Sequence, residues 1–335
     1  MVVGASGNVG SAIVRRLRRE DDIDVEGVSR RRPASGPPFD GVPWHEVDVG
    51  SDGADRALEG VLAGADAVVH LAWLLQPNHD EAALHRTNVG GTATVLRAIA
   101  AAGVPQLVIA SSVGAYSPGP KRRVDESWPT GGVRSSHYAR HKAENERALD
   151  AFERAQPGVA VARLRPGLVM QGAAGAELKR LFLGPLIPTR WLAPMLLPLL
   201  PVPPRVVSQV VHADDLAEAV LLILRRRASG AFNLATDPVV GPRQLARLLH
   251  GRWLPVPQSP VRALLWAAWR LHLVRADPGW LHLAAGIPLM STARARTELG
   301  WRPATSALDA VGETIRAVAT HEHLPTSPQL DGDGR

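Results

Sequence analysis

Three glycines at intervals of three residues follow the short apolar run that opens the chain. Gly4, Gly7 and Gly10 stand in MVVGASGNVG, between a predicted strand at residues 1–3 and a predicted helix at residues 8–19. Glycines at such a junction permit a tight turn and close approach of the backbone to a pyrophosphate, which the N-terminal end of the helix attracts. The triplet alone is compatible with a purely structural turn. Its place between strand, helix and second strand predicts a dinucleotide-binding site.

The first half of the chain alternates β-branched runs with helical patterns. Strands are predicted at residues 1–3, 25–29, 67–71, 106–111 and 160–165, and helices at 8–19, 54–62, 81–102 and 136–155. This α/β alternation predicts a doubly wound parallel Rossmann-type sheet over residues 1–165, with helices on both faces. The first strand is shorter than the usual length of about 5–6 residues. This is expected if the start of the chain is truncated, or if the start of the gene was assigned too far downstream.

The pattern changes after Pro166, where loops and helices rich in Pro and Trp follow. A smaller, mostly helical substrate-binding cap is expected over residues 166–320, with some segments returning to the sheet. Residues 321–335 are expected to form a disordered tail. The apolar stretch at 181–204 contains seven prolines, which favours a lid or pocket wall over a membrane-spanning helix.

Composition limits the partners. The formal charge is +6, and no basic run is interleaved with aromatic residues, so arginines spread over helix faces are favoured over a nucleic-acid surface. There is no cysteine, which excludes disulfides and thiolate metal sites and suits a cytoplasmic location. We therefore expect a small-molecule substrate and no nucleic-acid or membrane partner. A homodimer is left open.

The end of the predicted second strand bears on the choice of cofactor. NAD-binding proteins usually keep an acid there for the ribose 2′-hydroxyl. This chain has Ser29, Arg30 and Arg31 instead, and a guanidinium suits a 2′-phosphate. Glu26 lies three residues earlier, inside the strand, and should miss the ribose. NADP is favoured over NAD; the alternative is a solvated arginine cluster.

One of the two tyrosines, Tyr138, stands four residues before Lys142, one of the three lysines. On a helix this spacing places both side chains on one face. Tyrosine titrates near pH 10, so acid/base work at neutral pH requires a cationic neighbour that stabilises the phenolate. Ser111 and Ser112 end the strand QLVIASS, at the sheet edge where ligands bind. A half-buried helical tyrosine is the alternative for Tyr138.

These motifs, taken in order, resemble the extended short-chain dehydrogenase/reductase family, also called NAD-dependent epimerase/dehydratase, over roughly residues 1–320. The matching segments are GASGNVG at 4–10, Asp48-Val49, VVHLA at 68–72, TNVGGT at 87–92, SSVGAY at 111–116, YARHK at 138–142, LRPG at 164–167, VHADDLA at 211–217 and LGWRP at 299–303. The last two are cap-domain signatures.

The resemblance implies a catalytic set of Ser112, Tyr138 and Lys142. Lys142 would lower the pKa of Tyr138 and hold the nicotinamide ribose. It also implies cofactor contacts from Gly4, Ser6, Gly7, Asn8, Val9, Gly10, Ser29, Arg30, Arg31, Asp48, Val49, Leu71, Ala72, Trp73, Asn88, Ser111, Tyr138, Lys142, Pro166 and Gly167. No metal is expected.

Departures from the family's pattern narrow the expected function. Sugar 4,6-dehydratases of this family place Thr-Asp-Glu after the paired serines, whereas this chain has Val113-Gly114. Pro166, Gly167 and Leu168 follow Arg165, where many nucleotide-sugar enzymes have an asparagine soon after. We expect an NAD(P)-dependent oxidoreductase that moves a hydride between the nicotinamide and a secondary alcohol or ketone of a small, apolar substrate. A nucleotide-sugar epimerase and a non-catalytic dinucleotide sensor are the alternatives.

Two further features have plain structural interpretations. His212 with Asp214 and Asp215 could suggest a metal site, but such a sequence before an Ala/Leu helix more often caps that helix. The tryptophans at 253, 266, 269 and 280 could line an apolar pocket. In RALLWAAWRLHLV the apolar positions fill much of a helix, so core packing is favoured for most of them.

Overall fold

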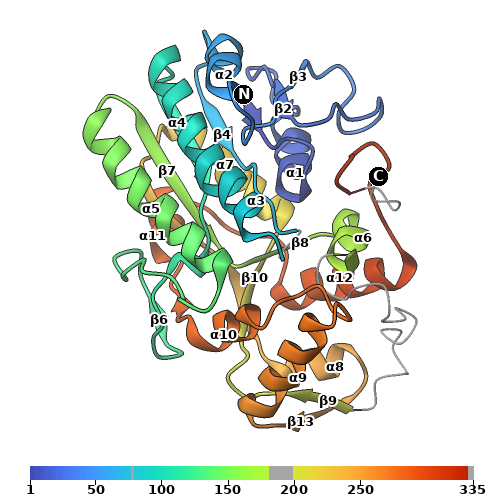
Figure 1. Cartoon of the computed structure of the whole chain (residues 1–335). Coiled ribbons are helices and arrows are strands. Elements are labelled where there is room, and N and C mark those ends of the chain that lie inside the picture. The colour runs from blue at the N-terminus through green and yellow to red at the C-terminus, as the bar shows by residue number, and fades with distance from the viewer. Residues whose placement is uncertain (77–78, 181–198, 331–335) are drawn as a thin grey trace.

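The computed structural model describes residues 1–76, 79–180 and 199–330. Its main body is a seven-stranded sheet covered by helices on both faces (Figure 1). The strand order is β11-β7-β5-β4-β1-β2-β3, and every pairing in it is parallel. The strands are β1 Val2–Val3, β2 Gly27–Ser29, β3 Trp44–Glu46, β4 Val68–His70, β5 Gln106–Ala110, β7 Ala160–Pro166 and β11 Gly230–Leu234. The predicted doubly wound parallel sheet is confirmed.

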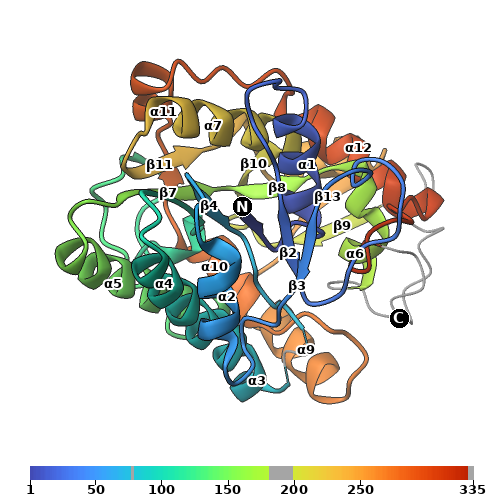
Figure 2. The same cartoon turned by 90° about the horizontal axis from the view of Figure 1, so that it is seen from above.

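Two groups of helices cover the two faces. On one face α1 (Asn8–Leu17) packs against α7 (Ala213–Arg226) around one apolar core. On the other face α2 (Ala54–Leu62), α4 (Gly91–Ala102) and α5 (His137–Ala155) surround a second core. Figure 2 shows these layers on opposite sides of the strands. Each helix turns one apolar stripe toward the sheet, which is why the helical periodicity was readable in the sequence.

The helix predicted at residues 81–102 is interrupted. α3 (Glu81–His85) leads into a π-helical turn at Arg86–Gly90, and α4 begins at Gly91. A Cβ atom on Gly91 would lie 2.7 Å from Val49 Cγ2, so only glycine permits this close packing. Single π turns are frequent at functional sites. This one carries Asn88.

The strand order reverses at β1, which lies between β2 and β4. In doubly wound sheets, ligands bind outside the carboxyl ends of the strands at such a reversal. β1 contains only Val2 and Val3, and the Met1 ammonium donates to Ala67 O at 2.9 Å. The glycine turn follows β1 directly, so it lies at the edge where a ligand is expected.

The residues after Pro166 that lie outside the main sheet are called the cap here. They include a three-stranded sheet in the order β12-β10-β8 and a parallel pair of β9 with β13, while β14 pairs with β6 (Arg123–Val124). The elements are β8 Leu168–Met170, α6 Gly175–Leu178, β9 Leu199–Val202, β10 Ser208–His212, β12 Thr236–Val240, α8 Pro242–Leu248, β13 Arg252–Pro255, α9 Gln258–Arg270, α10 Gly279–Gly286, β14 Leu289–Met290, α11 Ala293–Glu298 and α12 Ala307–Thr320.

The two cap-domain signatures contact each other. The Asp215 carboxylate accepts hydrogen bonds from the backbone N–H groups of Ala304 and Thr305, at 2.7 and 3.0 Å. The buried Trp301 donates from Nε1 to Asp215 O at 2.8 Å. His212 Nδ1 accepts from Asp214 N at 3.2 Å and so caps α7, the role that its position predicts.

Two expectations are wrong. Residues 321–330, predicted to be disordered, fold back on the main body, and Ser327 and Leu330 are completely buried. α9, predicted as core, contains no buried residue, and Trp266 is 55% exposed. In both cases the burial of the segment depends on how it packs against distant parts of the chain, which its own composition does not show. The lid was predicted at residues 181–204. Of these, the structure describes only residues 199–204, so most of the predicted lid lies outside the described residues.

Across residues 1–76, 79–180 and 199–330, no helix combines the length and the apolar character needed to cross a bilayer.

Candidate active site

The glycine turn has two glycines that the fold requires and one that leaves space. Gly4 has a φ of +87°, and a Cβ atom there would lie 2.6 Å from Ala72 N. A Cβ atom on Gly10 would lie 2.3 Å from Gly4 O. At Gly7 the nearest atom would be Gly4 O, at 3.6 Å. The backbone at Gly7, at the N-terminal end of α1, therefore has no close neighbour on its side-chain position.

The side chains of Ser6, Asn8 and Val9, which lie next to these glycines, have different surroundings. Ser6 is buried, whereas the Asn8 side chain is held by Gln171, whose Nε2 donates to Asn8 Oδ1 at 2.8 Å. Val9 packs against the core shared by α1 and α7. Gln171 was not identified from the sequence, because it lies 163 residues from Asn8 and no motif marks it.

The end of β2 presents the predicted arginines to solvent. Ser29 is buried, and its hydroxyl donates to Arg31 O at 2.7 Å. Arg30 and Arg31 are exposed, and Arg31 Nη2 donates to Pro328 O at 3.2 Å. Glu26 accepts from His45 at 2.7 Å, on the neighbouring strand, and is thereby held away from the end of β2.

Asp48 and Val49, which follow β3, have different surroundings. Asp48 is exposed, and its carboxylate accepts from Gly50 N at 2.9 Å. Val49 is buried against Gly91 of α4. Only Asp48 is therefore free to face a ligand.

The loop after β4 is fixed by Asn88. Its Oδ1 accepts from Leu74 N at 2.7 Å, and its Nδ2 donates to Leu74 O at 2.8 Å. Asn145 in turn donates to Asn88 O at 2.9 Å. Asn88, predicted as a cofactor contact, therefore holds the segment that carries Leu71, Ala72 and Trp73 over the sheet edge. Asn145 lies seven residues after Tyr138, on the same helical face, and this spacing could have identified it.

The structure brings Tyr138 and Ser112 together. Ser136 caps α5 by accepting from Ala139 N at 3.3 Å, which places Tyr138 in the first turn. Burial raises the pKa of the Tyr138 phenol, and the nearby Ser112 hydroxyl acts in the opposite direction. A Cβ atom on Gly114 would lie 2.8 Å from the Tyr138 ring, so glycine at this position makes room for it.

Two tryptophans enclose the Tyr138 ring. Trp73 meets it edge-on, with centroids 5.5 Å apart, and Trp280 lies 4.8 Å away on α10. Trp280 was only a general pocket candidate in the sequence. Its contact with Tyr138, 142 residues away in the chain, comes from the way α10 packs against the start of α5.

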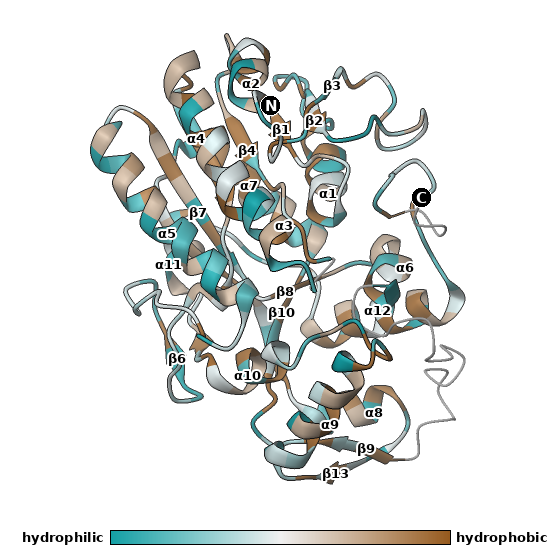
Figure 3. Ribbon diagram, viewed as in Figure 1, coloured by the Kyte–Doolittle hydropathy of each residue, from teal (hydrophilic) through white to brown (hydrophobic). Residues whose placement is uncertain are grey.

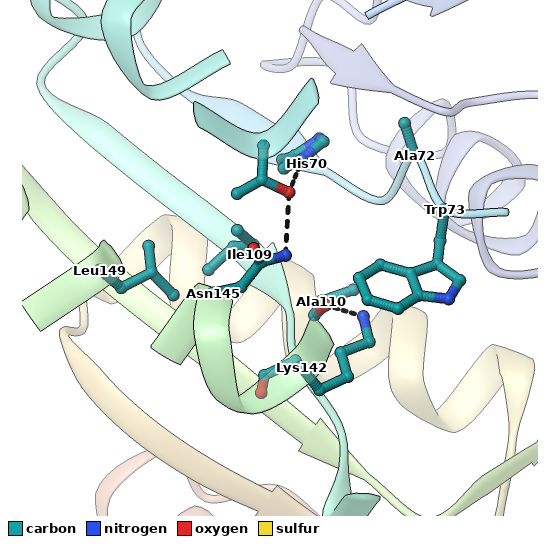
Figure 4. A pocket seen from close by; sticks show the side chains of 10 residues that line it. His70, Ala72, Trp73, Ile109, Ala110, Lys142, Asn145 and Leu149 are labelled. Carbon is teal, nitrogen blue, oxygen red and sulfur yellow. Dashed lines mark hydrogen bonds between the residues drawn. The ribbon is translucent and has the colours of Figure 1, made fainter. Parts of the chain in front are cut away.

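Lys142 lies deep in the site and does not contact the Tyr138 hydroxyl. Its Nζ donates to Ala110 O at 2.7 Å and sits 3.5 Å from the centre of the Trp73 ring, as Figure 4 shows. Burial lowers the pKa of Lys142 to about 7, although Glu146 acts in the opposite direction. The ammonium is directed at Trp73 and at a backbone carbonyl, and its expected effect on the pKa of Tyr138 stays a prediction.

The lowered pKa of Lys142 predicts a pH effect on stability. In the unfolded chain the amine has its ordinary value of 10.5, so between about pH 7 and 10.5 the unfolded state binds more protons. The free energy of unfolding should therefore rise with pH across this window, by up to about 1.4 kcal/mol per pH unit. Denaturant unfolding at pH 7 and pH 9 should show this rise in the wild type relative to Lys142→Met. Parallel pH dependence in the two proteins would contradict the assignment.

Glu146 of α5 is the centre of a buried ionic network. Glu146 accepts from Ser111 Oγ at 2.5 Å and from the guanidiniums of Arg163 and Arg165, each at 2.9 Å. Burial raises the pKa of Glu146, but these hydrogen bonds more than offset it and leave the pKa below its usual value. Ser111, predicted as a cofactor contact, is thus bound to Glu146, while Ser112 faces Tyr138.

Pro166 and Gly167 lie where β7 ends. A Cβ atom on Gly167 would lie 2.3 Å from Gln209 O, so the close approach of β10 requires this glycine. Their predicted contact with the nicotinamide stays a prediction.

The C-terminal segment covers the glycine turn. Ser6 Oγ donates to Gln329 Oε1 at 2.6 Å, and Ser327 Oγ donates to Ser6 O at 2.5 Å. The predicted phosphate-binding residues Ser6 and Arg31 thus both contact residues 327–329. A dinucleotide that used them would compete with these contacts.

A larger cleft lies on the other side of α5, with a volume of about 640 Å³. Ser135, His137 and Arg140 form one wall, and Arg262, Trp266 and Trp269 of α9 form another. Arg140 pairs with Glu81, and His137 lies 3.6 Å from Asp277. The cleft is therefore polar on the side of α5 and aromatic on the side of the cap.

A family model described as "NAD dependent epimerase/dehydratase family" matches residues 1–235. The chain belongs to the NAD-dependent epimerase/dehydratase family. The resemblance inferred from the motifs is confirmed, and so is the expectation of a nicotinamide-dependent enzyme of the extended short-chain type. Membership does not distinguish the reactions found within this family, which include epimerisation, dehydration and reduction.

Curated relatives of this family include one much longer protein and two enzymes of similar length. An uncharacterized protein of Mycobacterium tuberculosis is 28% identical over 320 residues, 95% of this chain, but this chain spans only 30% of its length. UDP-glucose 4-epimerase of Streptomyces lividans is 25% identical, with 96% of each chain covered. A ketoreductase of Stigmatella aurantiaca that acts on a farnesylated dihydroquinoline oxide is 28% identical over 73% of this chain and 75% of its own.

Solved structures agree in fold. UDP-glucose-4-epimerase from Stenotrophomonas maltophila, with bound NAD and formylated UDP-arabinopyranose, superposes with a TM-score of 0.70 at 19% identity. The match covers 96% of this chain and 97% of that one. Likeness at this identity shows the shared fold of the family and leaves the substrate open.

Proposed function

We propose that the chain is a reductase or dehydrogenase that prefers NADP and acts on a ketone or secondary alcohol of a small, apolar substrate. The observation that carries the proposal is the pairing of Tyr138 with Ser112 inside a wall formed by Trp73 and Trp280. A proton carrier within an aromatic enclosure suits a carbonyl group with apolar substituents.

The residues around the predicted cofactor site fit a dinucleotide. Gly7 places no side chain at the N-terminal end of α1, where a pyrophosphate would bind once residues 327–329 give way, and no acid ends β2 to repel a 2′-phosphate. When bound, the nicotinamide would supply or accept the hydride. NADP rather than NAD is proposed on the ground of Arg30 and Arg31.

The chain's own groups then handle the substrate oxygen and its proton. Ser112 would hold the oxygen by a hydrogen bond, and the Tyr138 hydroxyl would transfer the proton. Lys142 Nζ lies 5.9 Å from the Tyr138 ring centre and 3.5 Å from that of Trp73. A modest movement of the Trp73 loop would let the ammonium approach the phenol and the ribose, which is the role proposed for it.

An epimerase acting on a nucleotide sugar is the second candidate. The full-length similarity to an epimerase supports it, and Arg262, which lines the cleft, could pair with a phosphate. A screen of apolar ketones and of nucleotide sugars, in which NADPH absorbance is followed, distinguishes the two. Net NADPH consumption with ketones supports the reductase; interconversion of sugars without net consumption rejects it.

Cofactor selectivity is expected to depend on the arginines after β2. A charge-assisted hydrogen bond is worth about 1.5–3 kcal/mol, so one arginine could favour NADPH over NADH by roughly ten- to a hundredfold. Dissociation constants for both cofactors should be measured on wild type, Arg30→Ala and Arg31→Ala. Equal affinities in wild type, or no selective loss in either variant, would show that the arginines are surface charge.

The C-terminal segment is expected to weaken cofactor binding. Gln329→Ala removes the acceptor that occupies Ser6 Oγ, so this hydroxyl becomes available to a phosphate oxygen. One net hydrogen bond of about 0.5–1.5 kcal/mol corresponds to a roughly two- to tenfold tighter dissociation constant for NADPH. Titration of both proteins with NADPH tests this. Weaker binding by Gln329→Ala would mean instead that the segment clasps the cofactor.

A further inference from the structure

The cleft between the start of α5 and the cap helix α9 has the size of a ligand site. Its volume is about 640 Å³, within the range of about 300–1,000 Å³ that is usual for small-molecule sites. Figure 3 shows hydrophilic residues along α5, whereas α9 carries both hydrophilic and hydrophobic ones. Among the described residues, neither Tyr138 nor Ser112 lines the cleft. A molecule held here would therefore contact other side chains than those of the proposed reaction.

One side of α9 faces the cleft. Arg262, Trp266 and Trp269 line it, and their spacing of four and then three residues places them on the same side of the helix. Trp269 stacks on His79, with ring centroids 4.3 Å apart and an angle of 10° between the rings, which fixes its position. Trp266 has no ring partner in the described part of the chain and is 55% exposed. Its indole therefore offers a free aromatic surface to the cleft.

The charged side chains of the cleft are paired, with one exception. Arg140 pairs with Glu81, and the Asp277 carboxylate lies 3.6 Å from His137 Nδ1. Arg262 is exposed, and across residues 1–76, 79–180 and 199–330 it has no hydrogen-bond or ion-pair partner. The cleft therefore contains an unpaired guanidinium one helical turn from the free indole.

These two groups define the chemistry of a ligand. A guanidinium forms two parallel hydrogen bonds with a carboxylate, and a flat ring packs well on an exposed indole. Four residues along a helix correspond to about 6 Å, a separation that suits a carboxylate attached directly to an aromatic ring system. We propose that the cleft binds a flat aromatic molecule with one carboxylate, whose ring packs on Trp266 and whose carboxylate pairs with Arg262.

The acidic residues of the cleft limit the charge of this ligand. Glu81 and Asp277 both line the cleft, and Arg140 is already neutralised by Glu81. One negative charge completes the pairing of Arg262, whereas each further negative charge would lie near carboxylates without a cation of its own. This disfavours the diphosphate of a nucleotide sugar. The proposal goes beyond the proposed reaction and does not depend on it.

Isothermal titration calorimetry of the full chain without cofactor tests the proposal, with 2-naphthoate as the probe and the uncharged 2-naphthamide for comparison. Naphthoate is expected to bind with a dissociation constant of about 0.1–1 mM, the affinity that ligand efficiency gives for a molecule of this size. Naphthamide should bind at least about tenfold more weakly, because it keeps the ring but loses the charge-assisted pair. Since neither cofactor nor turnover is involved, the result is independent of whether the proposed reaction is correct.

Two substitutions separate the roles of the guanidinium and the indole. Arg262→Ala should weaken the binding of naphthoate by roughly ten- to a hundredfold and leave the binding of naphthamide nearly unchanged. Trp266→Ala should weaken the binding of both by about two- to tenfold. In the matched controls, Leu264→Ala removes an exposed side chain from the opposite side of α9, and Arg247→Ala removes an exposed arginine from α8. Both controls should bind naphthoate like wild type, and circular dichroism should show the same fold in all variants.

Four results would overturn the proposal. The first is no binding of naphthoate by wild type up to about 10 mM, tenfold above the weakest expected constant. The second is wild-type affinity for naphthoate in Arg262→Ala, and the third is an equal loss in the two controls. The fourth is tighter binding of UDP than of naphthoate that Arg262→Ala abolishes, which would make the cleft a nucleotide site.

Discussion

Tyr138→Phe is expected to lower turnover by about 10²–10⁴-fold while leaving the dissociation constant for NADPH nearly unchanged, because the ring stays and only the proton carrier is removed. The aromatic contacts of the ring with Trp73 and Trp280 do not involve the hydroxyl, so the fold of the site should be kept. Steady-state rates on a reducible ketone and a binding titration measure the two quantities separately.

The second tyrosine provides a matched control. Tyr116 is completely buried, and its hydroxyl donates to Asn233 at 2.7 Å. The same hydroxyl accepts from Arg165 Nη1 at 3.1 Å. Tyr116→Phe should therefore cost about 2–4 kcal/mol of stability, as for one neutral and one charge-assisted buried hydrogen bond, and leave turnover within a fewfold of wild type. Lys142→Ala should impair both cofactor binding and turnover. Wild-type turnover in Tyr138→Phe would remove this residue from the mechanism.

Glu146→Ala is expected to destabilise the protein by about 3–5 kcal/mol, because it leaves Arg163 and Arg165 charged and buried without their shared carboxylate. Glu146 is 1% exposed, and the two arginines are 6% and 5% exposed. Urea unfolding of wild type and variant measures the difference. The variant should also lose activity, since Ser111, at the base of the site, loses its acceptor.

Asp150→Ala is the corresponding control. Asp150 also contacts Arg163, at 2.7 Å, but its side chain is 52% exposed. An exposed ion pair typically contributes about 0–1 kcal/mol, so the change in unfolding free energy should be small. If Glu146→Ala costs no more than Asp150→Ala, the buried network is not a source of stability.

The features that depend on neighbouring residues could be predicted from the sequence. The glycine turn, the parallel strands and the helix that carries Tyr138 follow from local spacing and periodicity, which act over a few residues. The contact between Tyr138 and Ser112 also followed, because parallel strands and their helices meet at one sheet edge.

The features that depend on packing between distant parts of the chain could not be predicted from the sequence. Ser6 and Gln329 are 323 residues apart, and nothing in the tail's composition indicated that it would cover the glycine turn. The direction of the Lys142 ammonium depends on Trp73, which a different part of the chain supplies. The apolar pattern of α9 was compatible with core or surface, and only its position at the end of the cap showed that it is exposed.

Transfer of an isotopic label tests the central claim most directly. The purified enzyme would be incubated with NADPH deuterated at the transferable position of the nicotinamide and with an apolar ketone, and the alcohol examined by mass spectrometry. The account predicts one deuterium on the carbinol carbon of the product, formed together with oxidised cofactor, and little product from Tyr138→Phe. Absence of label transfer to any ketone, combined with epimerisation of a nucleotide sugar at constant cofactor oxidation state, would contradict it.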